Sequence, residues 1–407
     1  MSSRDFPFRP PPLVATEPLR WVLARAFGPA GCAPGPVAGA AAAELAERLG
    51  LAARILARGD ADALAAELGP GALARLRDER RALAARQLRH EAALALFSTA
   101  AAALEVPFAP LKGGALTLGG WSLAATRPAS DLDLLVPGDR LEELQRDLLR
   151  RGFMVTGTAY EHQAPMLRHP AGGQLELHRV VLGVRLARRR SADFDALARA
   201  GLLDGRPPAP TVADRRLLRW PGREVLAAHA IVHALAQHVL APGAYSGLLL
   251  VGDLVDLGAV GAPGRELLET VRPWIRAAVP GRVSLAAFDL VDSLAAGEPP
   301  APGDAECLLA HFVLGATDPR YQAALRARWL ERPLSDRSRT IARLALLRRT
   351  LVPPRRPGPG GEPEAWRAWT LRLARRPFEL ARSWRAARRA RRPAPPDDPG
   401  PGARRPD

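Results

Sequence analysis

Two aspartates one residue apart, Asp131 and Asp133, stand in the apolar run SDLDLLV. Successive side chains of a β-strand alternate between its faces, so both carboxylates point one way while Leu132 and Leu134 point into the core. Carboxylates about 7 Å apart along a strand can bridge two magnesium ions that lie roughly 3.5 to 4 Å apart. The spacing predicts a two-metal site, although exposed aspartates on strand edges give the same pattern.

A lysine and a glycine pair precede this strand. The run VPFAPL predicts a short strand, after which Lys112 is followed by Gly113 and Gly114 at the start of a helix. Such a turn lets backbone N–H groups approach an anion. Lys112, the single lysine of the chain, or Arg127 could neutralise a triphosphate, and Ser130 completes the candidate nucleotide-binding set. A plain tight turn and a solvated arginine remain the alternatives.

Nucleotidyl transfer with two metals needs a third acid that lets an acceptor hydroxyl lose its proton. Glu176, in the run QLELHR, lies between Leu175 and Leu177 and therefore faces away from the core of a neighbouring strand. His178 follows on the same face. An exposed glutamate and a hydrogen-bonded histidine are the alternatives.

A further pair of histidines, His229 and His233, lies at i, i+4 on one predicted helix. This spacing can bind a metal, but no glutamate base stands between the two histidines. Helical histidines among alanines and leucines are more often hydrogen-bonded core groups. With His178, we place them as candidates for an acceptor pocket.

The elements that must position these residues change period along the chain. Alanine and leucine recur at helical spacing over residues 36–105, with a break at Gly69-Pro70. Strand, helix, strand and helix then follow, and after them come antiparallel strands around the loop HPAGG. This order predicts a mixed sheet with helices on one face.

Helical spacing returns after a proline-rich loop that begins near residue 204. The expected organisation is an irregular N-terminus at 1–35, a helical region at 36–105, a sheet core at 106–203, a helical domain at 204–350, a linker with a basic tryptophan-containing helix at 351–392, and a disordered tail at 393–407.

Composition excludes several classes of protein. Two cysteines, Cys32 and Cys307, cannot build a disulfide framework or a cysteine-based zinc site, so we expect a reducing, cytoplasmic compartment. The N-terminus has no apolar signal segment. No apolar run reaches the roughly 18 residues of a membrane helix.

The net charge of +16 is concentrated in the C-terminal residues 335–407, which contain 19 arginines against 7 acidic residues. The catalytic region is therefore nearly neutral. The tail leaves RNA open as a partner, and packing of its tryptophans on other helices is the alternative. We do not expect peripheral membrane contact.

Together the runs LKGG, RPASDLDLLV and LELH resemble the DNA polymerase β-like nucleotidyltransferase superfamily, and most closely its bacterial branch of uncharacterised nucleotidyltransferases. The resemblance covers roughly residues 80–390 and is specific between 110 and 180. It implies an α+β fold with a polymerase-β-like mixed-sheet core flanked by helical regions. It also implies that Asp131, Asp133 and Glu176 are the catalytic metal ligands.

One departure from that superfamily is Gly114, which stands where a serine usually follows the first glycine. The expected activity is magnesium-dependent transfer of a nucleoside monophosphate from an NTP to a hydroxyl, with two Mg²⁺ ions and an unknown small-molecule, peptide, protein or tRNA acceptor. A degenerate fold that binds a nucleotide without catalysis, and a helical RNA-binding protein, remain the alternatives.

Overall fold

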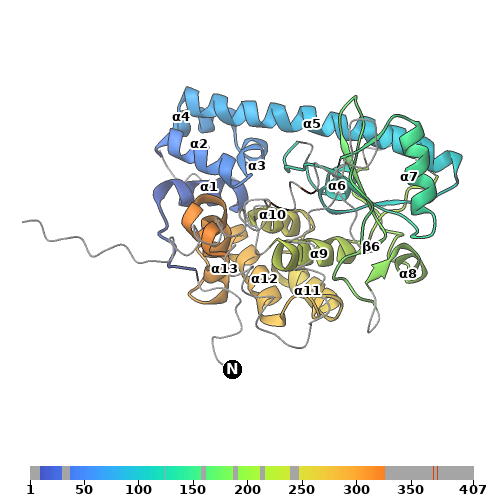
Figure 1. Cartoon of the computed structure of the whole chain (residues 1–407). Coiled ribbons are helices and arrows are strands. Elements are labelled where there is room, and N and C mark those ends of the chain that lie inside the picture. Colours follow the sequence, from blue (N-terminus) through green and yellow to red (C-terminus); the bar gives the residue numbers. More distant parts are fainter. Residues whose placement is uncertain are drawn as a thin grey trace, which may run out of the picture. The chain divides into compact units, whose positions relative to one another are not determined.

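The computed structural model describes residues 10–29, 37–123, 125–156, 162–186, 191–210, 216–238 and 247–325, with Thr370 and Ala374. The helices and strands up to Thr317 belong to one unit (Figure 1). The end of the predicted helical domain at 326–350, the predicted linker and basic tryptophan-containing helix at 351–392 apart from Thr370 and Ala374, and the predicted tail at 393–407 lie outside the described residues.

A five-stranded mixed sheet contains the aspartate strand. Its members are β1 (Ala109–Pro110), β2 (Leu132–Leu135), β3 (Met154–Val155), β4 (Leu167–Arg168) and β5 (Gln174–His178), in the order β1-β2-β5-β4-β3. Strands β2 and β5 run parallel, and the other neighbours run antiparallel. Two short strands, β6 (Val180–Val181) and β7 (Ala192–Asp193), pair separately. The predicted α+β core with flanking helices is confirmed.

One face of the sheet is apolar and covered by α5 (Pro70–Ala103) and α7 (Leu141–Arg150). The leucines that alternate with the acids supply this face; they are Leu132, Leu134, Leu175 and Leu177, each at most 2% exposed. Phe97 of α5 packs edge-on against Phe108, with ring centroids 4.9 Å apart. A register slip of one residue would turn the aspartates into this apolar core and the leucines out of it, so packing of the leucines fixes which face carries the acids.

Helix α5 spans 34 residues and begins where the sequence predicts a break. Gly69 has a φ of +77° and ends α4 (Ala61–Leu68), a conformation that costs glycine little. Pro70 then starts α5, where its missing N–H would have no helical partner. The helix is long enough to contact the N-terminal helices at one end and the sheet at the other (Figure 1).

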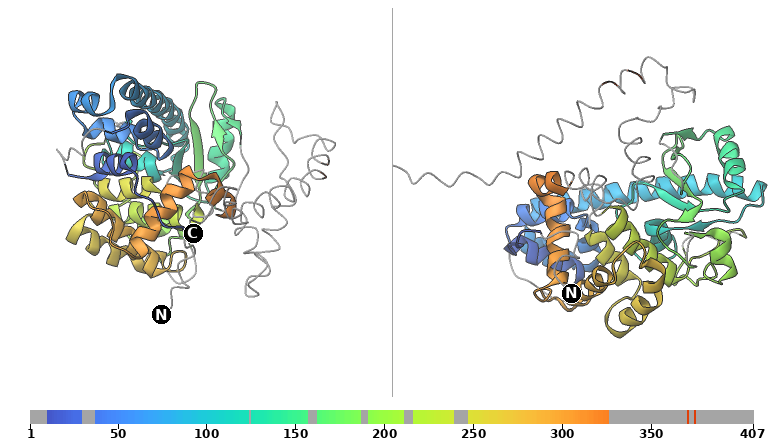
Figure 2. Two further views of the ribbon diagram at one scale, coloured as in Figure 1. Left: turned by 90° about the vertical axis from the view of Figure 1, so that its left-hand side faces the viewer. Right: turned by 60° about the horizontal axis from the view of Figure 1, so that its bottom comes forward.

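The remaining helices share one hydrophobic core, which contains Trp21, Ile55, Leu254 and Phe288. Segments far apart in sequence thus lie side by side: α1 contacts α12 and α2 contacts α13 (Figure 2). The helices not yet bounded are α1 (Glu17–Phe27), α2 (Gly39–Arg48), α3 (Ala52–Arg58), α8 (Phe194–Arg199), α9 (Arg223–Val232), the π-helical turn η1 (His233–Gln237), α10 (Leu248–Asp256), α11 (Gly261–Ile275), α12 (Gly281–Ala296) and α13 (Asp304–Thr317).

The second face of the sheet is also partly covered, which differs from the prediction of helices on one face. Leu135 at the end of β2 and Val181 belong to the same buried cluster as Val225 of α9. The sequence pattern could not show this, because α9 follows β2 by almost ninety residues. None of the helices in the described part of the chain combines the length and apolarity needed to cross a membrane.

Candidate metal and nucleotide site

Two of the predicted acids meet on neighbouring strands. Parallel pairing of β2 and β5 sets Asp133 opposite Glu176, and Leu135 opposite His178. Ligand atoms of Asp133, Glu176 and His178 lie within 4.8 Å of one another. Asp131 directly precedes β2 and lies outside this group of three, although alternation turns it toward the same face.

Asp133 accepts two hydrogen bonds at one oxygen. Lys112 Nζ lies 2.6 Å from Asp133 Oδ1, and His178 Nε2 lies 2.7 Å from the same atom. His178 Nε2 is also 3.6 Å from Glu176 Oε2. Lys112 has a φ of +48°, which is uncommon outside glycine. Strained backbone at such a residue is typical of a functional position, and here it begins α6 (Lys112–Leu118) beside the carboxylate.

The pKa values of the two aspartates shift in opposite directions. Burial opposes ionisation of Asp133, yet Lys112 and His178 together hold its pKa well below the usual range. Burial raises the pKa of Asp131 to about 6, and repulsion from Asp133 and Glu176 adds to this shift. Burial acts against the charge of Lys112, but Asp133 raises its pKa overall. Asp131 is therefore the acid whose charge is least compensated, and a cation would relieve it.

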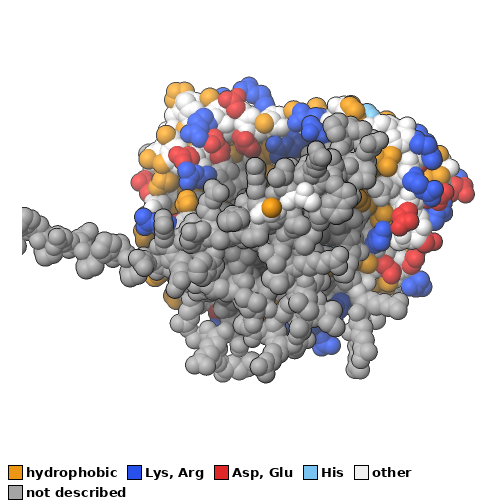
Figure 3. Space-filling model, in the orientation of Figure 1, with side chains coloured by type: hydrophobic (Ala, Val, Ile, Leu, Met, Phe, Trp, Pro, Cys, Tyr) orange, Lys and Arg blue, Asp and Glu red, His pale blue; other side chains and the backbone are white. Residues whose placement is uncertain are grey.

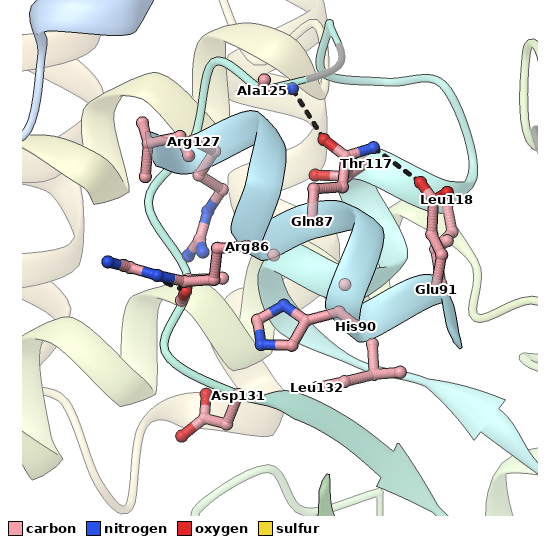
Figure 4. Close-up of a pocket in the computed structure, with 14 residues that line it drawn as sticks. Arg86, Gln87, His90, Glu91, Thr117, Leu118, Ala125, Arg127, Asp131 and Leu132 are labelled. Carbon is pink, nitrogen blue, oxygen red and sulfur yellow. Dashed lines mark hydrogen bonds between the residues drawn. The ribbon is translucent and has the colours of Figure 1, made fainter. Parts of the chain in front are cut away.

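A pocket adjoins Asp131 between α5, α6 and the loop before β2 (Figure 4). Gly113, Gly114 and Arg127 of the predicted nucleotide-binding set line it together with Asp131, and binding of a nucleotide there stays a prediction. The opposite wall comes from α5, whose lining side chains include Arg86, Gln87 and His90. Sequence reasoning missed this wall, because residues 36–105 indicate only a helical bundle. Polar residues at i, i+1 and i+4 on one helical face were the available signal.

Arg127 is already paired. Its Nε and Nη2 lie 2.5 and 2.9 Å from the two carboxylate oxygens of Asp253 on α10, and both side chains are buried. Ser122 Oγ donates to Asp256, 2.5 Å away, which also pairs with Arg54. These contacts fix the long loop between α6 and β2 to α10. A direct contact between Arg127 and a nucleotide stays a prediction.

The glycine pair has a packing role. A Cβ on Gly113 would lie 2.0 Å from Arg127 Nη1, and one on Gly114 would lie 2.4 Å from Leu132 Cδ1. Any side chain at Gly113 would therefore displace the arginine that pairs with Asp253. At Gly114, the end of a buried leucine occupies the space that a serine side chain needs. The departure from serine thus has a steric reason on this chain.

The Gly114→Ser variant is expected to be less stable by about 1–3 kcal/mol, the usual cost of forcing extra atoms into a packed core. The strain should fall in Gly114→Ser/Leu132→Val, because valine lacks the δ-carbons. A double-mutant cycle of unfolding free energies should give a favourable coupling of about 1 kcal/mol or more. Gly138→Ser is the matched control, since nothing lies within 4 Å of its Cβ position. Equal costs at Gly114 and Gly138 would contradict the steric explanation.

The histidines of the predicted acceptor pocket extend away from the acids. Ring centroids of His178 and His229 are 6.5 Å apart, and those of His229 and His233 are 6.2 Å apart. Burial, then the positive charges of Lys112 and His178, hold the pKa of His229 well below its usual range. Its Nδ1 is buried without a hydrogen-bond partner among the described residues, so a neutral imidazole borders the site.

The donor set suits a divalent cation. Two carboxylates, Asp133 and Glu176, meet within one strand pair, and Asp131 is adjacent. The ammonium of Lys112 against Asp133 already shows that positive charge is stabilised there. Because magnesium prefers oxygen ligands, the fit rests on the acids, with His178 holding Asp133. Lys112 and His178 both contact Oδ1 of Asp133, so a metal would bind through Oδ2 or replace one of these contacts.

A mixed sheet with acids on adjacent strands, a glycine turn into a helix and flanking helices is consistent with a nucleotidyltransferase fold. Residues 39–259 match the family described as uncharacterised nucleotidyltransferase, and the chain belongs to that family. The match begins earlier and ends earlier than the resemblance read from the motifs. No curated protein and no solved structure matches the chain.

Proposed function

We propose that this protein transfers a nucleoside monophosphate from an NTP to a hydroxyl group, with Mg²⁺ as the metal. The observation that carries the proposal is the register of β2 and β5, which brings Asp133 and Glu176 together beside the pocket that Asp131 and the glycine turn line. Family membership supports the reaction class.

The acids divide two roles between them in this proposal: metal binding and proton transfer. Asp131 and Asp133 hold the metal, which when bound stabilises negative charge on the phosphates. Glu176 takes the proton from the acceptor hydroxyl. His178 keeps the Asp133 carboxylate in place through its 2.7 Å hydrogen bond. The hydroxyl oxygen forms a bond to the α-phosphorus, the bond to the β-phosphate oxygen breaks, and pyrophosphate leaves.

The nucleotide would occupy the pocket beside Asp131. Gly113 and Gly114 give the triphosphate access to backbone N–H groups at the start of α6. Ser130 of the predicted nucleotide-binding set does not line this pocket. If a bound metal took its place at Asp133, Lys112 would be free to neutralise charge on the phosphates. His178, His229 and His233 would border the acceptor. RNA binding through the basic tail stays a prediction.

The test is transfer of label from each α-labelled NTP with Mg²⁺ and an extract as the source of acceptor. We expect label in a product together with an equal amount of pyrophosphate, and neither without Mg²⁺. The Asp131→Ala/Asp133→Ala variant is the negative control. Absence of both products with all four NTPs would contradict the proposal.

A second candidate is a protein that binds an NTP without catalysis. The contacts of Lys112 and His178 with Asp133 favour it, because both already occupy one oxygen of the carboxylate that should hold the metal. Calorimetry distinguishes the candidates: a binding protein holds the NTP, releases no pyrophosphate, and binds it equally well without Mg²⁺.

A further inference from the structure

A second cavity, of about 380 Å³, adjoins the pocket beside Asp131 and shares Arg86 and His90 of its wall. Three arginines line it: Arg86 and Arg89 from α5 and Arg168 from β4. His90, Ser130 and Gln174 also line this cavity. Its size is that of a pocket for a small molecule.

The cavity is strongly positive. No acidic side chain lines it, and none of its three arginines forms an ion pair with a carboxylate in the described part of the chain. The arginines act on His90, which also lines the cavity. Burial lowers the pKa of His90, and the positive charges of Arg86 and Arg89 lower it further. Basic side chains follow the edge of the molecule along which α5 runs (Figure 3). Guanidinium groups gathered around a hollow are suited to a phosphate, which they can bind in a bidentate manner.

The cavity is built by close packing. Gly172 and Gly173, in the turn between β4 and β5, have φ values of +96° and +83°. A Cβ on Gly172 would lie 2.3 Å from Arg89 Cδ, and one on Gly173 would lie 2.5 Å from the Arg89 carbonyl oxygen. The turn therefore rests directly on α5 and holds the stem of Arg89 at the cavity wall.

Its position relative to the acids indicates which substrate it serves. Gln174 lies two residues before Glu176 on β5, so its side chain faces the same way, about 7 Å from the acid along the strand. Ser130 directly precedes Asp131. The nucleotide pocket lies toward α6, and the cavity lies toward β5 and β4. In-line displacement brings the acceptor in opposite the leaving pyrophosphate, so the Glu176 side belongs to the acceptor.

We infer that the acceptor is a small molecule that carries a phosphate group, which binds among Arg86, Arg89 and Arg168 while its hydroxyl reaches Glu176. This inference rests on the proposed nucleotidyl transfer. The hydroxyl oxygen bonds to the α-phosphorus, its proton passes to Glu176, and pyrophosphate leaves. The acceptor's own phosphate is unchanged in the reaction.

The first test measures binding of inorganic phosphate by calorimetry with Mg²⁺ and a saturating NTP analogue that has a methylene between its α- and β-phosphates. We expect the Arg89→Ala/Arg168→Ala variant to bind phosphate about tenfold or more weakly and to bind the analogue as the wild-type protein does. Arg77→Ala/Arg80→Ala, which removes two exposed arginines elsewhere on α5, should change neither. Phosphate that competes with the analogue would assign the cavity to the triphosphate and overturn the inference, as would absence of phosphate binding.

The second test uses label transfer with the small-molecule fraction of an extract, before and after treatment with a phosphatase that is then removed. We expect dephosphorylation to lower transfer about tenfold or more, and Arg89→Ala/Arg168→Ala to lower it similarly with the untreated fraction. Undiminished transfer in both arms would overturn the phosphate subsite alone, as would an acceptor found only in the macromolecular fraction. Phosphate binding through Arg89 and Arg168 without transfer from any NTP would instead overturn the nucleotidyl transfer, and with it the acceptor role.

Discussion

The Asp131→Asn variant is expected to lose nucleotidyl transfer by about 1,000-fold or more and yet to be more stable than the wild-type protein in the absence of metal. The loss of activity follows from the metal's contribution, since several kcal/mol of transition-state stabilisation correspond to this factor. Asp131 is suited to this test because Lys112 and His178 bind the other aspartate. Its replacement leaves no cation unpaired.

The gain in stability follows from the pKa of Asp131, which burial and repulsion raise to about 6. A carboxyl whose folded pKa lies above its unfolded value binds protons more tightly when folded, so its ionised form destabilises the fold at neutral pH. The penalty is present above about pH 6 and is relieved as pH falls toward 4. Asparagine removes it, by at most about 3 kcal/mol for a shift of this size.

Urea unfolding of the metal-free proteins at pH 7.5 and at pH 4.5 measures this effect. The Asp131→Asn variant should exceed the wild-type protein in stability at the higher pH, and this advantage should fall to about a third at the lower one. Asp139→Asn, which removes an exposed carboxylate a few residues later, should alter neither stability nor transfer. A variant that is inactive and also less stable at pH 7.5 would mean that Asp131 supports the fold and not the reaction.

The sequence predicted the local parts of this site because their patterns are local. Alternation of Asp131 and Asp133 with leucines predicted the strand and its acid face, and burial of those leucines in the structure agrees. Gly69-Pro70 predicted the start of α5, and the loop HPAGG predicted the turn between β4 and β5. In each case the signal lies within a few residues of the feature.

What the sequence could not predict depends on contacts between distant segments. The pairing of Asp133 with Glu176 requires the register of two strands that forty residues separate. Lys112 looked like a phosphate ligand, whereas the structure pairs it with Asp133. Arg86 and Arg89 lie in a segment for which the sequence predicted only helices, and they become cavity walls because the β4–β5 turn lies on α5. Helical periodicity does not encode such a neighbour.

Arg127 depends on a contact with a distant segment that the sequence could not show. Its replacement by methionine is expected to destabilise the protein by about 3–5 kcal/mol. The substitution leaves Asp253, whose side chain is 2% exposed, without the guanidinium that binds both its oxygens. Burial raises the pKa of Asp253 even with Arg127 present. Without the arginine this pKa should rise further, so the destabilisation should shrink as pH falls and the carboxyl becomes protonated.

Restoring neutrality should recover the fold. Arg127→Met/Asp253→Leu replaces both charges with apolar groups. Its free energy of unfolding is expected to lie within about 1–2 kcal/mol of the wild-type value, because exchange of a buried ion pair for well-packed apolar side chains is often nearly neutral. Arg75→Met provides the matched control: its pair with Glu47 has similar geometry, at 2.6 Å, but is solvent-exposed, and such pairs contribute about 0–1 kcal/mol.

The same variants separate the structural role of Arg127 from a role in nucleotide binding. If Arg127 serves only the ion pair with Asp253, Arg127→Met should lower the free energy of unfolding measured with urea in the absence of nucleotide. The double variant should then regain both stability and NTP affinity. If Arg127 binds the triphosphate, the double variant should regain stability while its affinity for NTP with Mg²⁺ stays low. An Arg127→Met protein as stable as the Arg75→Met control would contradict the buried ion pair, since an uncompensated carboxylate at that depth carries a cost that no surface pair carries.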